Sequence, residues 1–198
     1  MTLSELINNR QSNRKYKEQA VERELVVKCI EAARLAPSAC NAQAWKFVVV
    51  DQTDLCKQLA EASTGLGMNR FVAQAPVIIT VVIERANITS SIGSLIKNKD
   101  YSQIDIGIAV EHICLQAVEL GLGSCILGWF DEPKVKKLLK IPSSKRVPLL
   151  ITLGYPNDNQ RTSTRVTCCQ SRATFAVTRS LTGAPKFTIF LNVAPDAS

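Results

Sequence analysis

The chain has 198 residues, of which 46% are hydrophobic and 21% are charged. These values are typical of one globular domain that is large enough to fold without disulfide or metal staples. No stretch approaches the roughly 18 consecutive apolar residues of a membrane-spanning helix. The polar, amphipathic N-terminus lacks the apolar region of a secretory signal. We therefore expect a cytoplasmic protein with no membrane partner.

The formal net charge of +7 is unevenly distributed along the chain. Five basic residues and one acidic residue lie at or after Gln160, which leaves 19 basic and 16 acidic residues before it. The body of the chain has no basic face studded with aromatic residues, so nucleic-acid binding is not expected.

Hydrophobic periodicity predicts helices and strands in alternation. Apolar residues at positions 25, 26, 29, 30 and 33 indicate an amphipathic helix, and the β-branched run Trp45–Val50 indicates a buried strand. In chain order we expect a helix at Thr2–Asn9, a helix at Glu22–Leu35, a strand at Trp45–Val50, a helix at Thr53–Ser63, a strand at Val77–Ile83, an irregular segment at Ala86–Ser102, a helix at Asp105–Leu120, a strand at Ser124–Trp129, a helix at Pro133–Leu139 and a strand at Val147–Leu153.

The helix expected at Asp105–Leu120 is apolar around most of its circumference, so we expect it to be buried inside the domain or against another subunit. Four buried strands interleaved with helices indicate an α/β or α+β sandwich, with helices on both faces of one sheet. Gly121 and Gly123 are interpreted as the stop of this helix before the next strand. The long segment Ala86–Ser102 resembles a lid or binding loop.

The chain lacks the residues of most self-sufficient active sites. Its seven cysteines have no metal-ligand spacing, and Cys29, Cys56, Cys114 and Cys125 are interpreted as buried thiols. The single histidine, His112, is interpreted as structural. There is no glycine-rich phosphate loop. If the protein is an enzyme, its chemistry therefore comes from a cofactor.

Two segments could bind such a cofactor. Arg10-Gln11-Ser12-Asn13-Arg14 places two guanidinium groups and a hydroxyl within five residues, a combination that could clamp a phosphate. On these residues alone, an ordinary solvated surface is the better interpretation. The small-residue segment Ala36–Trp45 would let a flat ring approach the backbone, and the alternative is a plain helix stop.

These segments resemble motifs of the flavin-dependent nitroreductase family, which recur here in the family's order over roughly residues 3 to 167. Arg10-x-Ser12-x-Arg14 resembles the opening motif, and Ala36-Pro37-Ser38-x-x-Asn41-x-Gln43-x-Trp45 the second, in which the family more often has proline at the position of Ala44. The other similar segments are Asn69–Pro76, Asp105–Ala109 with Gly121–Cys125, Leu127–Phe130, Leu138–Pro142 and Leu153–Pro156.

The resemblance implies an α+β three-layer sandwich, with a mixed central sheet flanked by helices, in an intertwined homodimer that binds FMN at the subunit interface. Arg10, Ser12 and Arg165, with Gln11 in the same motif, are then expected at the phosphate and ribityl chain. Arg14, Asn69 and Arg70 are expected at the pyrimidine edge of the ring. Pro37, Ser38, Ala39 and Asn41 are expected from the other subunit. Leu127 and Gly128 are expected against the ring, with the Gly128 N–H directed at flavin N5.

The resemblance also implies a reaction. NAD(P)H would reduce FMN, and a small acceptor such as a nitroaromatic or a quinone would then be reduced in a ping-pong cycle. No protein side chain is expected to be an obligate acid or base. Trp129 and Phe130 are interpreted either as shapers of acceptor choice or as core residues. Neither the natural acceptor nor a preference for NADH or NADPH follows from the residues.

The resemblance ends after Arg165. We therefore expect a nitroreductase-like FMN-binding domain at 1–165 and an atypical tail at 166–198. This tail either wraps the partner subunit or reflects a change of reading frame. Two alternatives stay open for the function: a flavin-binding or vestigial protein without turnover, and a specialised member that consumes its flavin or dehalogenates an aromatic substrate.

Overall fold

The structure, a computed structural model, describes residues 1–84, 101–159, 177–179 and 185–187. The chain forms two compact units, Met1–Gln160 and Arg161–Ser198. In the second unit, β5 (Val177–Arg179) pairs antiparallel with β6 (Pro185–Phe187). The expected division after Arg165 remains a prediction, because that residue lies outside the described residues.

The first unit is built on a four-stranded sheet with the order β1-β2-β4-β3. Its strands are β1 (Trp45–Val50), β2 (Val77–Ile83), β3 (Gly123–Leu127) and β4 (Arg146–Gly154). All three strand pairs are antiparallel. The mixed character expected of the sheet is confined, within the described residues, to a parallel bridge between Ser12 and Ser124.

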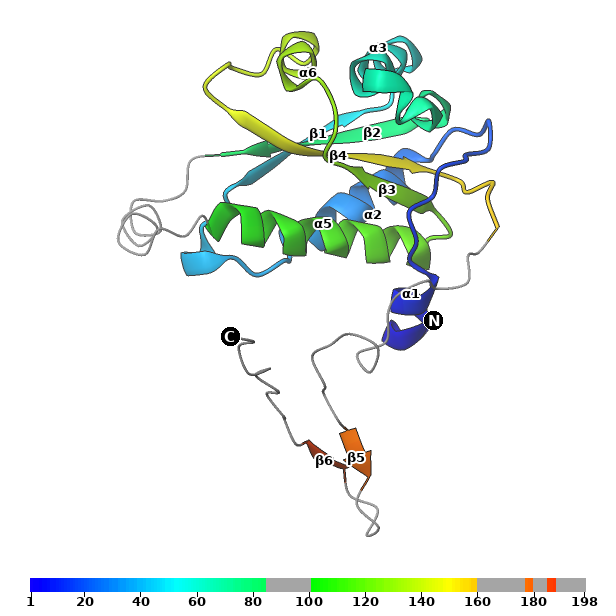
Figure 1. Cartoon of the computed structure of the whole chain (residues 1–198), viewed down its shortest axis with the longest axis vertical. Helices are drawn as coiled ribbons and strands as arrows, with labels where there is room; N and C mark the ends of the chain where they lie inside the picture. The colour runs from blue at the N-terminus through cyan, green and yellow to red at the C-terminus, as the bar shows by residue number, and fades with distance from the viewer. Residues whose placement is uncertain (85–100, 160–176, 180–184, 188–198) are drawn as a thin grey trace, which may run out of the picture. The chain divides into compact units, whose positions relative to one another are not determined.

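Helices cover both faces of the sheet, as predicted, so the fold is an α+β sandwich (Figure 1). Helices α2 (Arg23–Arg34) and α5 (Tyr101–Glu119) lie on one face, and α3 (Thr53–Ser63) and α6 (Glu132–Leu138) on the other. Because side chains alternate along a strand, β2 contributes to both cores. Ile79 packs with α2 and α5 in what we call the first core. Its neighbour Ile78 packs with α3 and α6 in the second core.

Helix α5 contributes many of the buried residues of the first core. It begins at Tyr101, so the last two residues of the segment expected to be irregular are helical, while residues 86–100 lie outside the described part. Ile106, Ala109 and Ile113 are buried, but Ile104 is 56% exposed. Within the described part of the chain, therefore, the helix is not covered at Ile104. At its C-terminus, Gly121 adopts φ +74° and the N–H of Leu122 donates to the carbonyl of Ala117 at 2.8 Å. This αL stop confirms the role predicted for Gly121.

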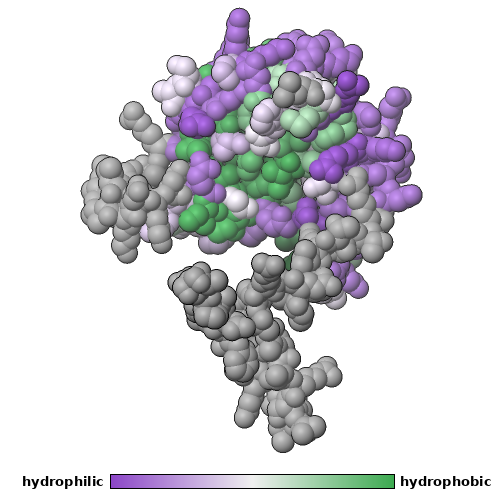
Figure 2. All heavy atoms as spheres, viewed as in Figure 1, coloured by the Kyte–Doolittle hydropathy of each residue, from purple (hydrophilic) through white to green (hydrophobic). Residues whose placement is uncertain are grey.

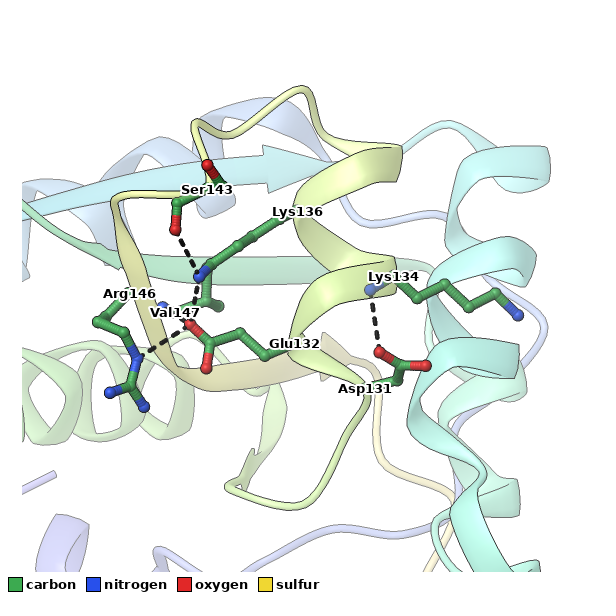
Figure 3. Close-up of polar contacts among 7 residues, drawn as sticks. All are labelled: Asp131, Glu132, Lys134, Lys136, Ser143, Arg146 and Val147. Carbon is green, nitrogen blue, oxygen red and sulfur yellow. Dashed lines mark hydrogen bonds and ion pairs between the residues drawn. The ribbon is translucent and has the colours of Figure 1, made fainter.

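The short helices α1 and α6 each begin at a side-chain N-cap. Helix α1 (Leu3–Asn9) has a capping box, in which Thr2 and Glu5 exchange hydrogen bonds. Asp131 caps α6 by accepting from the N–H of Lys134 at 3.0 Å. The carboxylate of Glu132 then joins α6 to β4, because it binds Lys136 at 2.8 Å, Arg146 at 3.2 Å and the N–H of Val147 at 2.9 Å (Figure 3).

The thiols predicted to be buried are buried, and Cys40 is exposed. Burial raises the pKa of Cys29 to about 12 and that of Cys114 to about 11, because a thiolate is poorly solvated in the core. His112 is half-buried, and its Nδ1 lies 3.1 Å from the carbonyl oxygen of Ala32 on α2, a partner from a neighbouring helix of the same fold. None of the described helices is both long enough and apolar enough to cross a bilayer.

Candidate functional site

The first predicted motif forms part of an extended segment, residues 10–17, which we call the strap. The strap crosses the end of the sheet beside β3, where the N–H of Asn13 donates to the carbonyl of Ser124 at 2.9 Å. The buried Tyr16 hydroxyl lies 3.0 Å from the carbonyl of Asn13 and 2.7 Å from Thr152 Oγ1. Burial raises the pKa of Tyr16, so its hydroxyl remains a neutral hydrogen-bonding group.

Asp158 fixes the strap from the other side. Its carboxylate accepts from Asn13 Nδ2 at 2.7 Å and from the N–H of Arg14 at 3.0 Å. Gln11 Nε2 donates to the neighbouring carbonyl of Asn159 at 3.3 Å. Sequence reasoning missed Asp158, because it lies more than 140 residues from the strap and belongs to no recognised motif.

The two arginines of the strap have different surroundings. Arg10 Nε lies 3.4 Å from Glu111 of α5, and the arginine side chain is only 17% exposed. Arg14 is exposed, and Ser12, between them, is half-buried. The motif therefore has one guanidinium group held against the fold and one that reaches solvent.

The second predicted motif forms a loop, residues 37–43, at the N-terminal half of α5. Cys40, Asn41 and Gln43 all have positive φ, at 53°, 51° and 45°. The N–H of Ala39 donates to both carboxylate oxygens of Asp105, at 3.2 and 3.1 Å. Ser38 Oγ accepts from the N–H of Gln43 at 3.0 Å.

The third group lies where β3 ends. Asn69, at φ +59°, donates through Nδ2 to the carbonyls of Ser63, at 3.3 Å, and Trp129, at 3.0 Å. Leu127 is buried, and Gly128 is exposed, with no atom within 4 Å of the position that a Cβ would occupy. The strand ends at Leu127, two residues earlier than expected, so Trp129 is 56% exposed.

The structure thus places the predicted residues in three groups. The strap and the Leu127–Trp129 segment lie beside the two ends of β3, and Asn69 is joined to the second of these. The 37–43 loop lies against the N-terminal half of α5, whereas Arg10 contacts Glu111 further along that helix. Arg70 is exposed next to Asn69. Arg165 and most of the Ala86–Ser102 connection lie outside the described residues.

Comparison with known proteins decides the family. The model of the nitroreductase family matches residues 7–67 and 57–155, which together make up most of the chain. The chain belongs to the nitroreductase family. The matched ranges of this nitroreductase include every predicted cofactor-binding residue except Arg165.

Individual relatives agree with this assignment. The chain is 33% identical over 166 residues to a protein of Methanothermobacter thermautotrophicus with the provisional name NADH dehydrogenase/NAD(P)H nitroreductase, covering 82% of this chain and 81% of the relative. An FMN-dependent nitroreductase from Clostridium difficile R20291 superposes with a TM-score of 0.68 at 30% identity, covering 80% of this chain and 90% of that one. An iodotyrosine deiodinase from Thermotoga neapolitana is 25% identical over 178 residues, with 79% and 89% of the two chains covered. The protein is therefore an oxidoreductase of the nitroreductase type.

Proposed function

We propose that this nitroreductase binds FMN and transfers two electrons from NAD(P)H to a small acceptor, such as a nitroaromatic or a quinone, in a ping-pong cycle. Membership of the family supports the reaction class. The similarity to an FMN-dependent nitroreductase supports the flavin, and that to the Methanothermobacter protein supports the nicotinamide donor.

The observation that carries the proposal is the way in which the strap is anchored. Its hydrogen bonds to the fold use backbone groups and the side chains of Asn13, Tyr16 and Gln11. The Ser12 hydroxyl and the Arg14 guanidinium are not among these anchors. The Ser12 hydroxyl is thus available to a ligand next to the Arg10 side chain, which Glu111 holds against the fold, and a hydroxyl beside a fixed guanidinium fits a phosphate and its neighbouring hydroxyls. In this proposal Arg10, Gln11 and Ser12 hold the phosphate and ribityl end; Arg165, which the resemblance assigns to the same end, lies outside the described residues.

The groups around β3 fit the flat end of FMN. Asn69 Nδ2 donates both of its hydrogen bonds to protein carbonyl oxygens. The amide oxygen of Asn69 can therefore accept a hydrogen bond from a ring N–H. Gly128 is exposed and has open space where other residues carry Cβ, so a flat ring can approach its backbone. Bound FMN would supply hydride transfer at N5 and gain negative charge on its pyrimidine side. Arg14 and Arg70 would stabilise that charge.

We further propose that the site is shared between two subunits of a homodimer. The 37–43 loop, with Pro37, Ser38, Ala39 and Asn41, contacts a different part of α5 from the strap. The partner's loop would therefore complete each site. Apolar side chains remain on the surface in the monomer, including Ile104 of α5 and Ile126 of β3. Figure 2 shows an apolar area in the middle of the face that carries α5 and β3. A second copy would cover such a face.

The absorbance spectrum of the purified full-length protein tests this proposal. We expect a flavin spectrum, either on purification or after adding FMN, that bleaches on anaerobic addition of NADH or NADPH. Light scattering should give twice the mass of one chain. A colourless protein that takes up no FMN would overturn the cofactor assignment. A yellow protein that NADH and NADPH both fail to bleach would instead favour the flavin-binding alternative without turnover.

The similarity to the deiodinase supports one second candidate, reductive dehalogenation of an aromatic substrate. The reduced protein should be mixed anaerobically with iodotyrosine and with a nitroaromatic. Reoxidation by the nitroaromatic alone supports the first proposal, and release of iodide supports the second.

A further inference from the structure

The backbone of the 37–43 loop adopts an intrinsically unfavourable conformation. Left-handed φ values are unfavourable for residues with a Cβ, because the Cβ then lies too close to the following carbonyl oxygen. Three such residues, Cys40, Asn41 and Gln43, occur within four positions. Asn tolerates this conformation better than Cys or Gln, because its short polar side chain can hydrogen-bond to the nearby backbone. Such a conformation persists only where surrounding structure enforces it.

Part of that enforcement comes from within the loop. Ser38 Oγ accepts from the N–H of Gln43, and Asn41 Oδ1 accepts from Gln43 Nε2 at 2.8 Å. These contacts define the shape of the loop but do not connect it to the rest of the fold. The connection to α5 is made by Ala39, which directly precedes the first left-handed residue.

The partner of Ala39 is an unusual one, because Asp105 is only 5% exposed. A buried carboxylate is costly unless hydrogen-bond donors satisfy it. Here both of its oxygens lie within 3.2 Å of the Ala39 nitrogen. Asp105 directly precedes Ile106, the first residue of α5 that is buried in the core with α2. It is therefore rigidly placed, and its bond to the loop is charge-assisted and correspondingly strong.

We propose that Asp105 is a positioning residue for cofactor binding: it fixes the 37–43 loop so that Pro37, Ser38, Ala39 and Asn41 are preorganised to contact FMN. This role rests on the proposed function. Asp105 itself touches no cofactor in this account and acts through the Ala39 N–H. A buried acid on the core helix thereby links the packing of the fold to the affinity of the site.

The test uses Asp105→Ala and Asp105→Asn in the full-length protein. Hydrogen exchange of the 36–44 segment is measured without FMN, and the FMN Kd is measured by fluorescence quenching. For Asp105→Ala we expect faster exchange at Ala39 and an FMN Kd at least about tenfold higher, as for loss of one charge-assisted bond. Asp105→Asn keeps the shape and one accepting oxygen, so we expect a smaller rise, of about threefold. This variant also preserves the test if Asp105→Ala fails to fold.

A general loss of stability is controlled by Val135→Ala. Val135 is fully buried on the opposite face of the sheet, in the core formed with α3 and α6, whereas the buried residues of α5 belong to the core on the other face. We expect it to lower the unfolding temperature and leave the FMN Kd and Ala39 exchange unchanged. If the wild type binds FMN and Asp105→Ala binds it with the same Kd, the positioning role is wrong. If the wild type binds no FMN, the proposed function fails as well, while hydrogen exchange still shows whether Asp105 holds the loop.

Discussion

The side chain of Asn13 lies where a β-carbon on Gly123 would have to be. A Cβ built on Gly123 would approach Asn13 Cγ and Oδ1 to 2.7 Å. Gly154, the cross-strand partner of Gly123, is also close to the strap, because its Cβ would lie 2.9 Å from Tyr16 Cδ1, and 2.7 Å from Pro76 Cδ. The two glycines let the strap lie directly on the sheet, and the position of Arg10, Ser12 and Arg14 depends on this close approach.

Gly123→Ala should therefore displace Asn13, which is buried and bonded to Asp158 and cannot swing away. We expect a loss of about 1–3 kcal/mol in unfolding free energy, as for other overpacked sites, and weaker FMN binding. Denaturant unfolding and FMN titration measure both. In an Asn13→Gly background the added cost of Gly123→Ala should fall below about 1 kcal/mol, since this change removes Asn13 Cγ and Oδ1 and also Asn13 Cβ, which lies 3.0 Å from the same position. Equal costs in the two backgrounds would contradict this account.

Lys140 follows helix α6 with φ +53°. The N–H of Ile141 donates to the carbonyl of Lys136 at 2.9 Å, which is the pattern of a C-terminal stop that glycine usually provides. We expect Lys140→Gly to raise the unfolding free energy by about 0.5–1 kcal/mol, because glycine adopts this conformation without strain. Lys137→Gly, inside the same helix, should lower it by a similar amount. Thermal unfolding of the two variants decides the sign of each effect.

The cysteines should differ sharply in reactivity. Burial raises the pKa of Cys56 and Cys114 to about 11, so both are thiols at neutral pH as well as inaccessible. Among the described cysteines, only Cys40 is exposed. Iodoacetamide at pH 7.5 followed by peptide mapping should modify Cys40 in the native protein and the buried cysteines only after unfolding. Because Cys40 lies in the 37–43 loop, FMN should slow its modification. Equal labelling rates with and without FMN would argue against a flavin at this loop.

Glu132 should make stability depend on pH in the acid range. Burial by itself would raise its pKa, but hydrogen bonds from Lys136, the N–H of Val147 and Arg146 outweigh burial and hold the pKa below its ordinary value. The carboxylate therefore stabilises the fold above the pKa of the unfolded chain, and this contribution is lost as the pH falls through the folded pKa. The difference in unfolding temperature between wild type and Glu132→Gln should be largest near pH 6–7 and shrink toward pH 3. A constant difference would show that charge is not involved.

Trp129 should influence which acceptors are reduced, if the proposed function holds. Its carbonyl is held by Asn69, and its Nε1 lies 3.1 Å from the place of a Cβ on Gly65, so an exposed indole is fixed beside the open Gly128. The adjacent Phe130 packs into the second core instead. We expect Trp129→Ala to raise KM for a nitroaromatic about tenfold, as for loss of one aromatic stacking contact, and Trp129→Phe to retain most of the affinity. KM for ferricyanide, which has no ring, should change little; a parallel rise for both acceptors would mean a general defect.

The local elements of this fold could be predicted from the sequence. The strand Trp45–Val50 and the helix Thr53–Ser63 have the expected bounds, because a β-branched run and a 3.6-residue period are properties of neighbouring residues. Gly121 was recognisable as a stop for the same reason. The predictions were wrong at the ends of some elements. Strand β3 ends at Leu127 instead of Trp129, and helix α5 begins at Tyr101 instead of Asp105. At those points tertiary contacts, such as the bond from Asn69 to the Trp129 carbonyl, outweigh local preference.

The sequence by itself also determined the family, through short motifs whose order survives divergence, and from this the identity of the cofactor-binding residues proposed here. Only the tertiary structure decided what holds those residues. Asp158 fixes the strap and Asp105 fixes the 37–43 loop, each from far along the chain. Gly123 matters because Asn13 lies on it. Hydrogen bonds and close packing depend on distances between atoms in space, and no local pattern of residues records which distant carboxylate faces a given N–H.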